Sequence, residues 1–324
     1  MAVTALTINE EKIVGGILGV VTGDALGLPV QFLSRDEVQS RPVARMQGGG
    51  AFNTPAGTWS DDSSLTLCLT ASLVEKGYDL TDIAQRFVRW FRDGYCTPWG
   101  YAFDIGNATR AAMRNLLQGV APLQAGPAGE NSNGNGSLMR ILPAALYFAH
   151  LPDRELIQRI SEVAKITHGH PRSQLGCSLY ALYVKELLAG ANPEAAYDNL
   201  RVKAQTVFAG SELERELAHY QRATSGCLQG LPKDEIRSTG YVVDTLEAAL
   251  WCLLTTGGFQ EAVLKAVNLG LDTDTVGAVA GGLAGVCYGL EGIPAEWLAA
   301  IIGHDWILAL ARRFAGVIIA AMNR

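Results

Sequence analysis

The chain has 324 residues, of which 48% are hydrophobic and 18% are charged, and its formal net charge is -6. This length and hydrophobic share are enough for one large core or for two smaller ones. Because the balance is mildly acidic and no run of Lys or Arg occurs, neither a nucleic acid nor an anionic membrane is an expected partner.

The cysteines and the apolar segments indicate an intracellular protein. Six cysteines are scattered without a CxxC pair, and most stand in apolar segments, as reduced core residues do. The apolar segment 13–30 lacks a preceding basic region and contains Asp24, so it is not expected to be a signal peptide. The apolar segment 276–290 is shorter than the roughly 20 residues that span a bilayer. We therefore predict a soluble, cytoplasmic protein.

Apolar residues recur at helical spacing along nearly the whole chain, and period-two runs of β-branched residues are almost absent. The predicted helices or helix pairs span residues 12–26, 63–76, 80–92, 103–118, 137–149, 153–166, 173–189, 193–208, 211–222, 243–255, 259–268, 275–289 and 295–322. Clusters of Gly and Pro separate many of them. Because no fixed-period repeat or low-complexity linker interrupts this pattern, we predict a single all-α domain over residues 1–324.

Two of these helices, 12–26 and 275–289, are rich in Gly and Ala and nearly free of charge. Each Gly in a helix costs roughly 1 kcal/mol relative to Ala. Because several glycines are present in each helix despite this cost, we expect these helices to pack closely against their neighbours in a crowded centre.

Two acidic clusters stand at the starts of predicted helices that are nearly free of charge, and each supplies two carboxylates and a hydroxyl within four residues. They are Ser60, Asp61 and Asp62 in the first cluster, and Asp272, Asp274 and Thr275 in the second. Either cluster alone would be interpreted as a helix cap with an acidic first turn. Four carboxylates brought together suit two Mg²⁺ or Mn²⁺ ions about 3.5–4 Å apart, and the lack of nearby His or Cys disfavours Zn²⁺. Because buried carboxylates are costly without a cation, the matched pair favours a metal site.

Three further stretches fall at predicted helix boundaries. The Gly-rich segment "NGNGSLMR" (133–140) opens a predicted helix and is either a phosphate cradle or a plain loop. His168 and His170 in "THGHP" are either ligand donors or favourable partners of a helix C-terminus. Asp104 in "FDIGNATR" stands at a predicted helix start, where capping is its ordinary role.

Taken in order, the motifs resemble those of the ADP-ribosylglycohydrolase family, which includes dinitrogenase reductase-activating glycohydrolase. They are "GDALGLPVQF", "GTWSDDSSL", "FDIGN", "NGSLMR", "THGHP" and "LDTDTVGAVAGGLAG", and they cover almost the whole chain. The resemblance implies an orthogonal all-α bundle whose cleft holds two Mg²⁺ ions, or Mn²⁺ in their place. It also implies hydrolysis of a glycosidic bond at C1 of the distal ribose of ADP-ribose.

The resemblance further implies a role for individual residues. The metal ligands would be Ser60, Asp61, Asp62, Asp272, Asp274 and Thr275. The residues that handle the proton would be Asp61, Asp62 or Asp104, and the substrate-binding residues would be Gln31, Asn107, Gly136, Ser137, Met139 and His168. Ser60 stands where the family usually has Thr, which keeps the hydroxyl oxygen. Gln31 stands where the family usually has Glu, and Gln can neither act as a general base nor carry charge.

The predicted protein is therefore a metal-dependent hydrolase that removes ADP-ribose from a modified protein side chain or from a small molecule. One alternative, suggested by Gln31, is hydrolysis of small nucleosides or of free ADP-ribose derivatives. Another is a catalytically silent protein that binds ADP-ribose, although the chain keeps all four metal aspartates.

Overall fold

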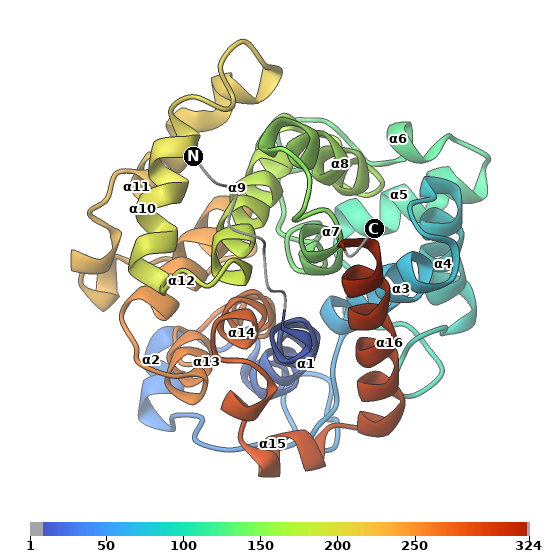
Figure 1. Ribbon diagram of the computed structural model, residues 1–324. Helices are drawn as coiled ribbons and strands as arrows, with labels where there is room; N and C mark the ends of the chain where they lie inside the picture. The colour runs from blue at the N-terminus through green and yellow to red at the C-terminus, as the bar shows by residue number, and fades with distance from the viewer. Residues whose placement is uncertain (1–8, 323–324) are drawn as a thin grey trace.

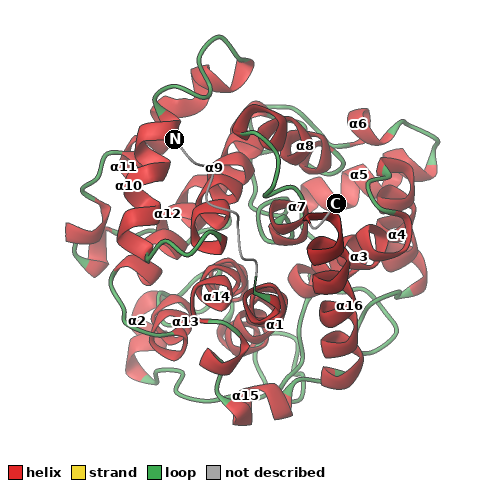
Figure 2. Ribbon diagram, viewed as in Figure 1, coloured by secondary structure: helices red, strands yellow, loops and turns green. Residues whose placement is uncertain are grey.

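The structure is a computed structural model and describes residues 9–322 as helices joined by loops (Figure 2). Within these residues no β-strand is present, and extended pairing is limited to two isolated bridges, Gly49–Thr54 and Gly134–Tyr241. The predicted all-α fold class is confirmed.

The α-helices within the described range, in chain order, are α1 (Glu10–Gly27), α2 (Arg35–Ser40), α3 (Asp61–Lys76), α4 (Leu80–Asp93), α5 (Asn107–Leu117), α6 (Pro122–Ala125), α7 (Leu142–Tyr147), α8 (Asp153–Lys165), α9 (Pro171–Leu188), α10 (Pro193–Ala204), α11 (Gln221–Thr224), α12 (Val242–Leu254), α13 (Phe259–Val267), α14 (Thr273–Tyr288), α15 (Ala295–Ala300) and α16 (His304–Met322). Five 3₁₀ helices accompany them: η1 (Leu28–Val30), η2 (Glu212–Tyr220), η3 (Leu228–Gly230), η4 (Lys233–Glu235) and η5 (Leu290–Gly292).

The helices α1 and α14 lie side by side at the centre of the molecule, although they come from opposite ends of the chain (Figure 1). Glycines of the two helices meet backbone to backbone. A methyl group built on Gly23 would lie 1.9 Å from the carbonyl oxygen of Gly277, and one on Gly281 would lie 2.2 Å from that of Gly19. Only Gly permits this approach, so the structure explains why the two predicted Gly-rich helices carry so many glycines. We call this contact the glycine seam.

By length and composition, the segment Glu10–Val30, which is α1 followed by η1, is apolar enough to cross a membrane, with a mean hydropathy of 1.7 in its most apolar 18-residue window. The whole of its most apolar 18-residue window is nevertheless buried inside the protein. It is therefore packed as a core helix, and the other helices surround it and α14 (Figure 1).

Several predicted boundaries differ from the observed ones. The predicted helix 137–149 shrinks to α7, because residues 136–140 form turns. The predicted segment 295–322 is divided into α15 and α16 by a bend that contains Gly303 at φ 77°. Most of 211–222 is the 3₁₀ helix η2. The short helix α2, absent from the prediction, is started by a capping box in which the Ser34 hydroxyl meets the Glu37 N–H and the Glu37 side chain meets the Ser34 N–H.

Candidate functional site

The first acidic cluster lies at the start of α3, where it is buried. Ser60 is the N-cap residue, and its hydroxyl accepts a hydrogen bond from the backbone N–H of Asp62 at 3.4 Å. The same hydroxyl donates to Asp62 Oδ2 at 3.0 Å. Asp61 and Asp62 are only 5% and 1% exposed. Because Ser60 supplies the cap, capping does not account for the two buried carboxylates.

A third aspartate, Asp24 in α1, joins this cluster. Its carboxylate accepts hydrogen bonds from the backbone N–H of Ser60 at 2.9 Å and from the backbone N–H of Ser63 at 3.1 Å. The Ser63 hydroxyl donates to it as well. Asp24 thus ties α1 to the first turn of α3. The predicted site did not include Asp24, although a single charged residue inside an apolar helix is a signal for such a role.

The second acidic cluster lies at the start of α14. Asp272 precedes the helix, and its Oδ2 accepts a hydrogen bond from Asn135 Nδ2 at 2.6 Å. Asp274 is fully buried, and neither carboxylate oxygen has a hydrogen-bond partner among the described residues. Carboxylate oxygens of Asp24, Asp62 and Asp274 lie within 4.8 Å of one another. The fold therefore unites the two predicted clusters. We call Asp24, Asp61, Asp62, Asp272 and Asp274 the aspartate cluster.

The aspartate cluster is unfavourable without a compensating positive charge. Burial, followed by repulsion from neighbouring carboxylates, raises the pKa of Asp61, Asp62 and Asp274 well above the ordinary aspartate value. Burial also raises the pKa of Asp24 to about 7, although its hydrogen bonds oppose the change. Within residues 9–322, no ion pair includes a member of the cluster.

The chemistry of the aspartate cluster fits hard divalent cations. Asp62 Oδ1 and both carboxylate oxygens of Asp274 are buried without a partner, which is costly unless a cation meets them. All the donor atoms are oxygens, as Mg²⁺ and Mn²⁺ prefer. The two predicted hydroxyl ligands, Ser60 and Thr275, are buried beside the aspartates at 1% and 5% exposure. The residues present thus suit the predicted cations, and the individual ligand assignments remain predictions.

Asp104 lies beside the cluster in a loop. The predicted helix 103–118 was wrong at its start, because α5 begins at Asn107 with Gly106 as N-cap, so Asp104 does not cap it. Asp104 has a left-handed φ of 55°, a strained conformation that concentrates at functional sites. Gln31 Nε2 donates to Asp104 Oδ2 at 2.8 Å. The neutral amide therefore holds Asp104 in place, whereas Glu at position 31 would set a second carboxylate against it.

The Gly-rich segment 133–140 forms a turn, and the interpretation that it opens a helix was wrong. Helix α7 begins only at Leu142. The turn is held by backbone hydrogen bonds from Asn135 N–H to the Gly240 carbonyl at 3.0 Å and from Val242 N–H to the Asn133 carbonyl at 3.1 Å. The residues before α12, rather than a helix terminus, thus set its shape.

A single cavity of about 330 Å³ connects these elements. Ten of the thirteen predicted site residues line it: Gln31, Asp61, Asp62, Asp104, Asn107, Gly136, Met139, His168, Asp272 and Thr275. The other three, Ser60, Ser137 and Asp274, are buried and are not part of its wall. The Ser137 hydroxyl accepts a hydrogen bond from the Cys177 thiol at 3.4 Å.

Of the two histidines in "THGHP", His168 is the one that lines the cavity. It is 2% exposed, and burial, followed by the charge of Arg140, lowers the pKa of its imidazole to about 3. A neutral imidazole is not the charged partner of a helix C-terminus that was the alternative. His170 caps α9, because its Nδ1 accepts from the backbone N–H of Arg172 at 3.1 Å.

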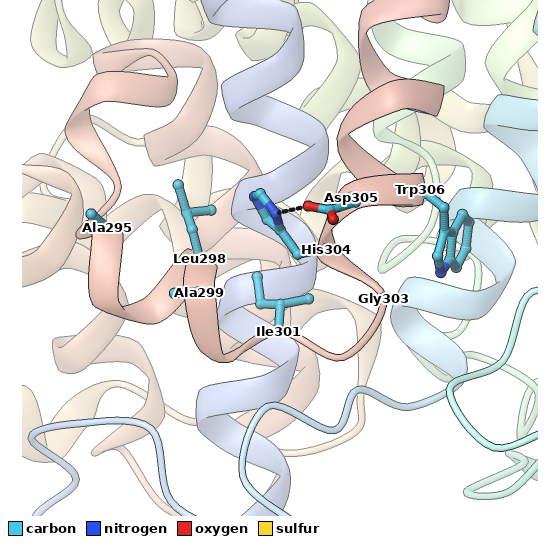
Figure 3. Close-up of a pocket in the computed structure, with 8 residues that line it drawn as sticks. All are labelled: Ala295, Leu298, Ala299, Ile301, Gly303, His304, Asp305 and Trp306. Carbon is cyan, nitrogen blue, oxygen red and sulfur yellow. Dashed lines mark hydrogen bonds and ion pairs between the residues drawn. The ribbon is translucent and has the colours of Figure 1, made fainter.

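A larger cavity of about 830 Å³ lies at the junction of α15 and α16 (Figure 3). Its wall is mainly apolar, and its polar feature is the pair of His304 Nδ1 and Asp305 Oδ1 at 3.1 Å (Figure 3). A single exposed ion pair offers no set of catalytic groups. The smaller cavity beside the aspartate cluster is therefore the candidate active site.

Comparisons with known proteins give a family and several relatives of this chain. The family model described as ADP-ribosylglycohydrolase matches residues 6–323. The ADP-ribosylarginine hydrolase Tri1 of Pseudomonas putida (strain GB-1) is 36% identical over 303 residues, which cover 92% of this chain and 76% of that protein. The ADP-ribosyl-[dinitrogen reductase] glycohydrolase of Rhodospirillum rubrum is 32% identical over 294 residues, which cover 90% of each chain.

A solved structure, described as an ADP-ribosylglycohydrolase-related protein complex, superposes with a TM-score of 0.81 at 35% identity, covering 96% of this chain and 99% of that one. The resemblance that the motifs carried is thereby confirmed over nearly the whole length. Because the family model covers residues 6–323 and the relatives are more than 30% identical over most of its length, the chain belongs to the ADP-ribosylglycohydrolase family of glycosyl hydrolases.

Proposed function

We propose that this protein hydrolyses the N-glycosidic bond between ADP-ribose and an arginine side chain of a modified protein, with two divalent cations, Mg²⁺ or Mn²⁺, in the aspartate cluster. The observation that carries the proposal is the cluster itself, with its three unpartnered buried oxygens on Asp62 and Asp274. The choice of arginine is supported by two relatives named ADP-ribosylarginine hydrolase, which are 36% and 34% identical to this chain.

Asp61, Asp62, Asp272 and Asp274 would hold the cations, with Ser60 and Thr275 as hydroxyl ligands. Asp24 has a different part, because its carboxylate already accepts hydrogen bonds from Ser60 and Ser63. It positions the start of α3. When bound, two divalent cations fix the hydroxyls of a sugar and make water a nucleophile near neutral pH.

The chain's own residues then carry the reaction at C1 of the ribose. As water attacks C1 and the C–N bond breaks, positive charge develops on the ribose, and the surrounding carboxylates stabilise it. Asp61 lines the cavity and would accept the proton of the attacking water. The arginine side chain would depart as a neutral guanidine, which then takes up this proton. Asp104, held by Gln31 through a hydrogen bond of 2.8 Å, lines the same cavity and would be the second proton acceptor.

A small ribosyl compound as substrate is the second candidate, and the neutral Gln31 is the observation that favours it. The family usually has Glu at position 31, whereas this chain has a neutral amide there, beside Asp104. The site would therefore suit a substrate whose hydrolysis does not need a second carboxylate at this position. A catalytically silent binder is less well supported, because binding alone does not require so costly a group of buried carboxylates.

A turnover assay tests the proposal. The enzyme is expected to release ADP-ribose from ADP-ribosyl-arginine in Mg²⁺ or Mn²⁺, to lose this activity in EDTA, and to regain it when excess metal is added. ADP-ribosyl-serine, O-acetyl-ADP-ribose and nucleosides are expected to react more slowly by about tenfold or more. Full activity in EDTA would contradict the metal site. Faster release of base from nucleosides would select the small-molecule alternative, and ADP-ribose binding without any turnover would select the silent one.

The cations are also expected to stabilise the fold in a pH-dependent way. Because burial raises the pKa of the cluster carboxylates above 3.8, to about 7 for Asp24, the metal-free folded state binds more protons than the unfolded state. Its free energy of unfolding therefore falls as pH rises through this range. Cations compete with these protons, so the increase in melting temperature on adding Mg²⁺ should be small at pH 5 and several degrees at pH 8.

Scanning fluorimetry with EDTA and with Mg²⁺ at both pH values measures this difference, and K⁺ at matched ionic strength is the control for screening. A melting temperature that Mg²⁺ raises equally at pH 5 and pH 8 would show that the cluster does not exchange protons for metal.

A further inference from the structure

Arg140 is a buried cation without a carboxylate partner. It is fully buried, none of the ion pairs in the described part of the chain includes it, and its Nε and Nη1 have no hydrogen-bond partner there. Its guanidinium lies 4.6 Å from the centroid of the Phe87 ring. Burial lowers the pKa of Arg140 to about 10, which leaves it charged at neutral pH. Met or Leu could fill a core position without the cost of burying an unpaired charge. The presence of Arg at this position therefore indicates a role beyond packing.

The contacts of Arg140 lead to the candidate active site. Arg140 Nη2 donates to the Thr167 hydroxyl at 2.7 Å and to the Val163 carbonyl at 3.3 Å. The Thr167 hydroxyl lies 2.9 Å from His168 Nδ1. The chain of contacts therefore runs from a buried guanidinium through one hydroxyl to the histidine that lines the cavity.

The direction of these hydrogen bonds follows from their chemistry. A guanidinium can only donate, so the Thr167 oxygen accepts from Arg140. The single hydroxyl proton of Thr167 is then free to point at His168 Nδ1, which accepts it. An imidazole whose Nδ1 accepts carries its proton on Nε2. The contacts thus select one of the two neutral forms of the His168 ring.

His168 Nε2 lies against the Gly-rich turn. A methyl group on Gly134 would be 3.6 Å from Nε2, and one on Gly136 would be 3.4 Å from it. Nε2 has no protein partner among the described side chains, and neither do the backbone N–H groups of Gly136 and Ser137. His168 Nε2 and the Gly136 N–H are thus donors without partners among the described residues at the wall of the cavity, the Ser137 N–H follows directly behind them in the chain, and carboxylates of the aspartate cluster line the same cavity. Neighbouring donors of this kind suit an anionic oxygen.

We propose that Arg140, acting through Thr167, is a positioning residue that fixes His168 as a neutral imidazole whose Nε2–H donates to an anionic oxygen of the ligand. With the proposed function as its basis, the geometry assigns this oxygen to the diphosphate of ADP-ribose. The arrangement gives the anion a donor without adding a titrating charge beside the aspartate cluster.

Nitrogen NMR of the ¹⁵N-labelled full-length protein at pH 7 tests the ring form directly. The ring-nitrogen signals of His168 are those that disappear in His168→Gln. We expect them to show a protonated Nε2 and an unprotonated Nδ1. In Thr167→Val, which keeps the side-chain shape but removes the hydroxyl, the two neutral forms are expected to mix. Thr167→Ser restores the hydroxyl and should restore the single form.

Binding of ADP-ribose gives the second measurement. Thr167→Val is expected to weaken binding about tenfold, the loss of one hydrogen bond to a charged group, and Thr167→Ser is expected to recover it. The matched control is Thr70→Val, which removes another fully buried hydroxyl, one that donates to the Thr66 carbonyl at 2.8 Å. With Thr70→Val, affinity for ADP-ribose should not change. Arg140→Met, if it folds, should weaken ADP-ribose binding as Thr167→Val does. If it does not fold, the comparison of Thr167→Val with Thr167→Ser is the test of the proposal.

The proposal is overturned if wild-type His168 carries its proton on Nδ1, or if Thr167→Val keeps the single Nε2–H form together with wild-type affinity. These outcomes are separate from failure of the proposed function. An enzyme that does not release ADP-ribose from arginine contradicts the proposed function and leaves the ring form and ADP-ribose affinity to be judged on their own.

Discussion

Asp274→Asn is expected to remove nearly all turnover and, at the same time, to make the metal-free protein more stable. Asp274 is fully buried, both of its oxygens lack partners within residues 9–322, and four neighbouring carboxylates raise its pKa further after burial. The isosteric amide removes the negative charge that a cation requires. Loss of such preorganised electrostatic stabilisation lowers kcat/KM by about 10²–10³-fold.

The gain in stability has the same origin as the loss of activity. In EDTA at pH 8 the wild-type carboxylate must either remain protonated or repel its neighbours, and Asn does neither. Replacing an unpaired buried charge by a neutral amide, which can donate to the neighbouring carboxylates, is worth about 1–3 kcal/mol, so the melting temperature of the variant in EDTA should exceed that of the wild type by several degrees. The rise that Mg²⁺ produces in the wild type should be absent.

The matched control for this variant is Asp234→Asn, the same change at an exposed position in η4. It should alter neither the rate nor the response to Mg²⁺. If Asp274→Asn unfolds in EDTA more readily than the wild type, Asp274 is a structural residue, and the interpretation of the cluster as a metal site fails.

Gly23→Ala is expected to disrupt both the fold and the active site, although it adds a single methyl group. The methyl would lie 1.9 Å from the carbonyl oxygen of Gly277, a contact that neither backbone can relieve without moving α1 away from α14. Overpacking of this severity costs at least about 3 kcal/mol. Urea unfolding followed by fluorescence of the tryptophans measures the loss.

Moving α1 away from α14 also disturbs the active site, because Gly23 immediately precedes Asp24. Any molecules that remain folded would carry Asp24, and with it the start of α3, out of place relative to Asp274. A misplacement of about 1 Å can cost 10²-fold in rate, so kcat/KM per folded molecule should fall to that extent. Such a loss separates damage to the site from simple loss of folded protein.

Gly316→Ala is the matched control for the glycine seam. Gly316 is also inside a helix, α16, and no atom lies within 4 Å of the position that its methyl would take. Because Ala is favoured over Gly in a helix by about 1 kcal/mol, this variant should be slightly more stable than the wild type and equally active. Equal stability of Gly23→Ala and Gly316→Ala would mean that the two central helices are not in backbone contact.

Local patterns in the sequence were sufficient for much of the site. These four aspartates, Asp61, Asp62, Asp272 and Asp274, stand at the starts of helices whose central turns carry no charge, and a helix start can be recognised from the residues on either side of it. Ten predicted residues consequently line one cavity. The predicted helix start at residue 137 was wrong, because it depends on contacts that are distant in the sequence. Residues 137–141 have helical composition, but backbone hydrogen bonds to the segment before α12 hold the preceding turn, and this segment is about a hundred residues away.

The sequence alone determined the all-α class, the family motifs, the two acidic clusters and the close packing expected of the Gly-rich helices, because each depends on spacing within a few helical turns. Only the tertiary structure decided that Asp24 completes the cluster and that Gln31 holds Asp104. It alone connected Arg140 through Thr167 to His168. These roles depend on which helices meet and at what distance. That is settled by the glycine seam of α1 and α14, where two segments from opposite ends of the chain come into backbone contact.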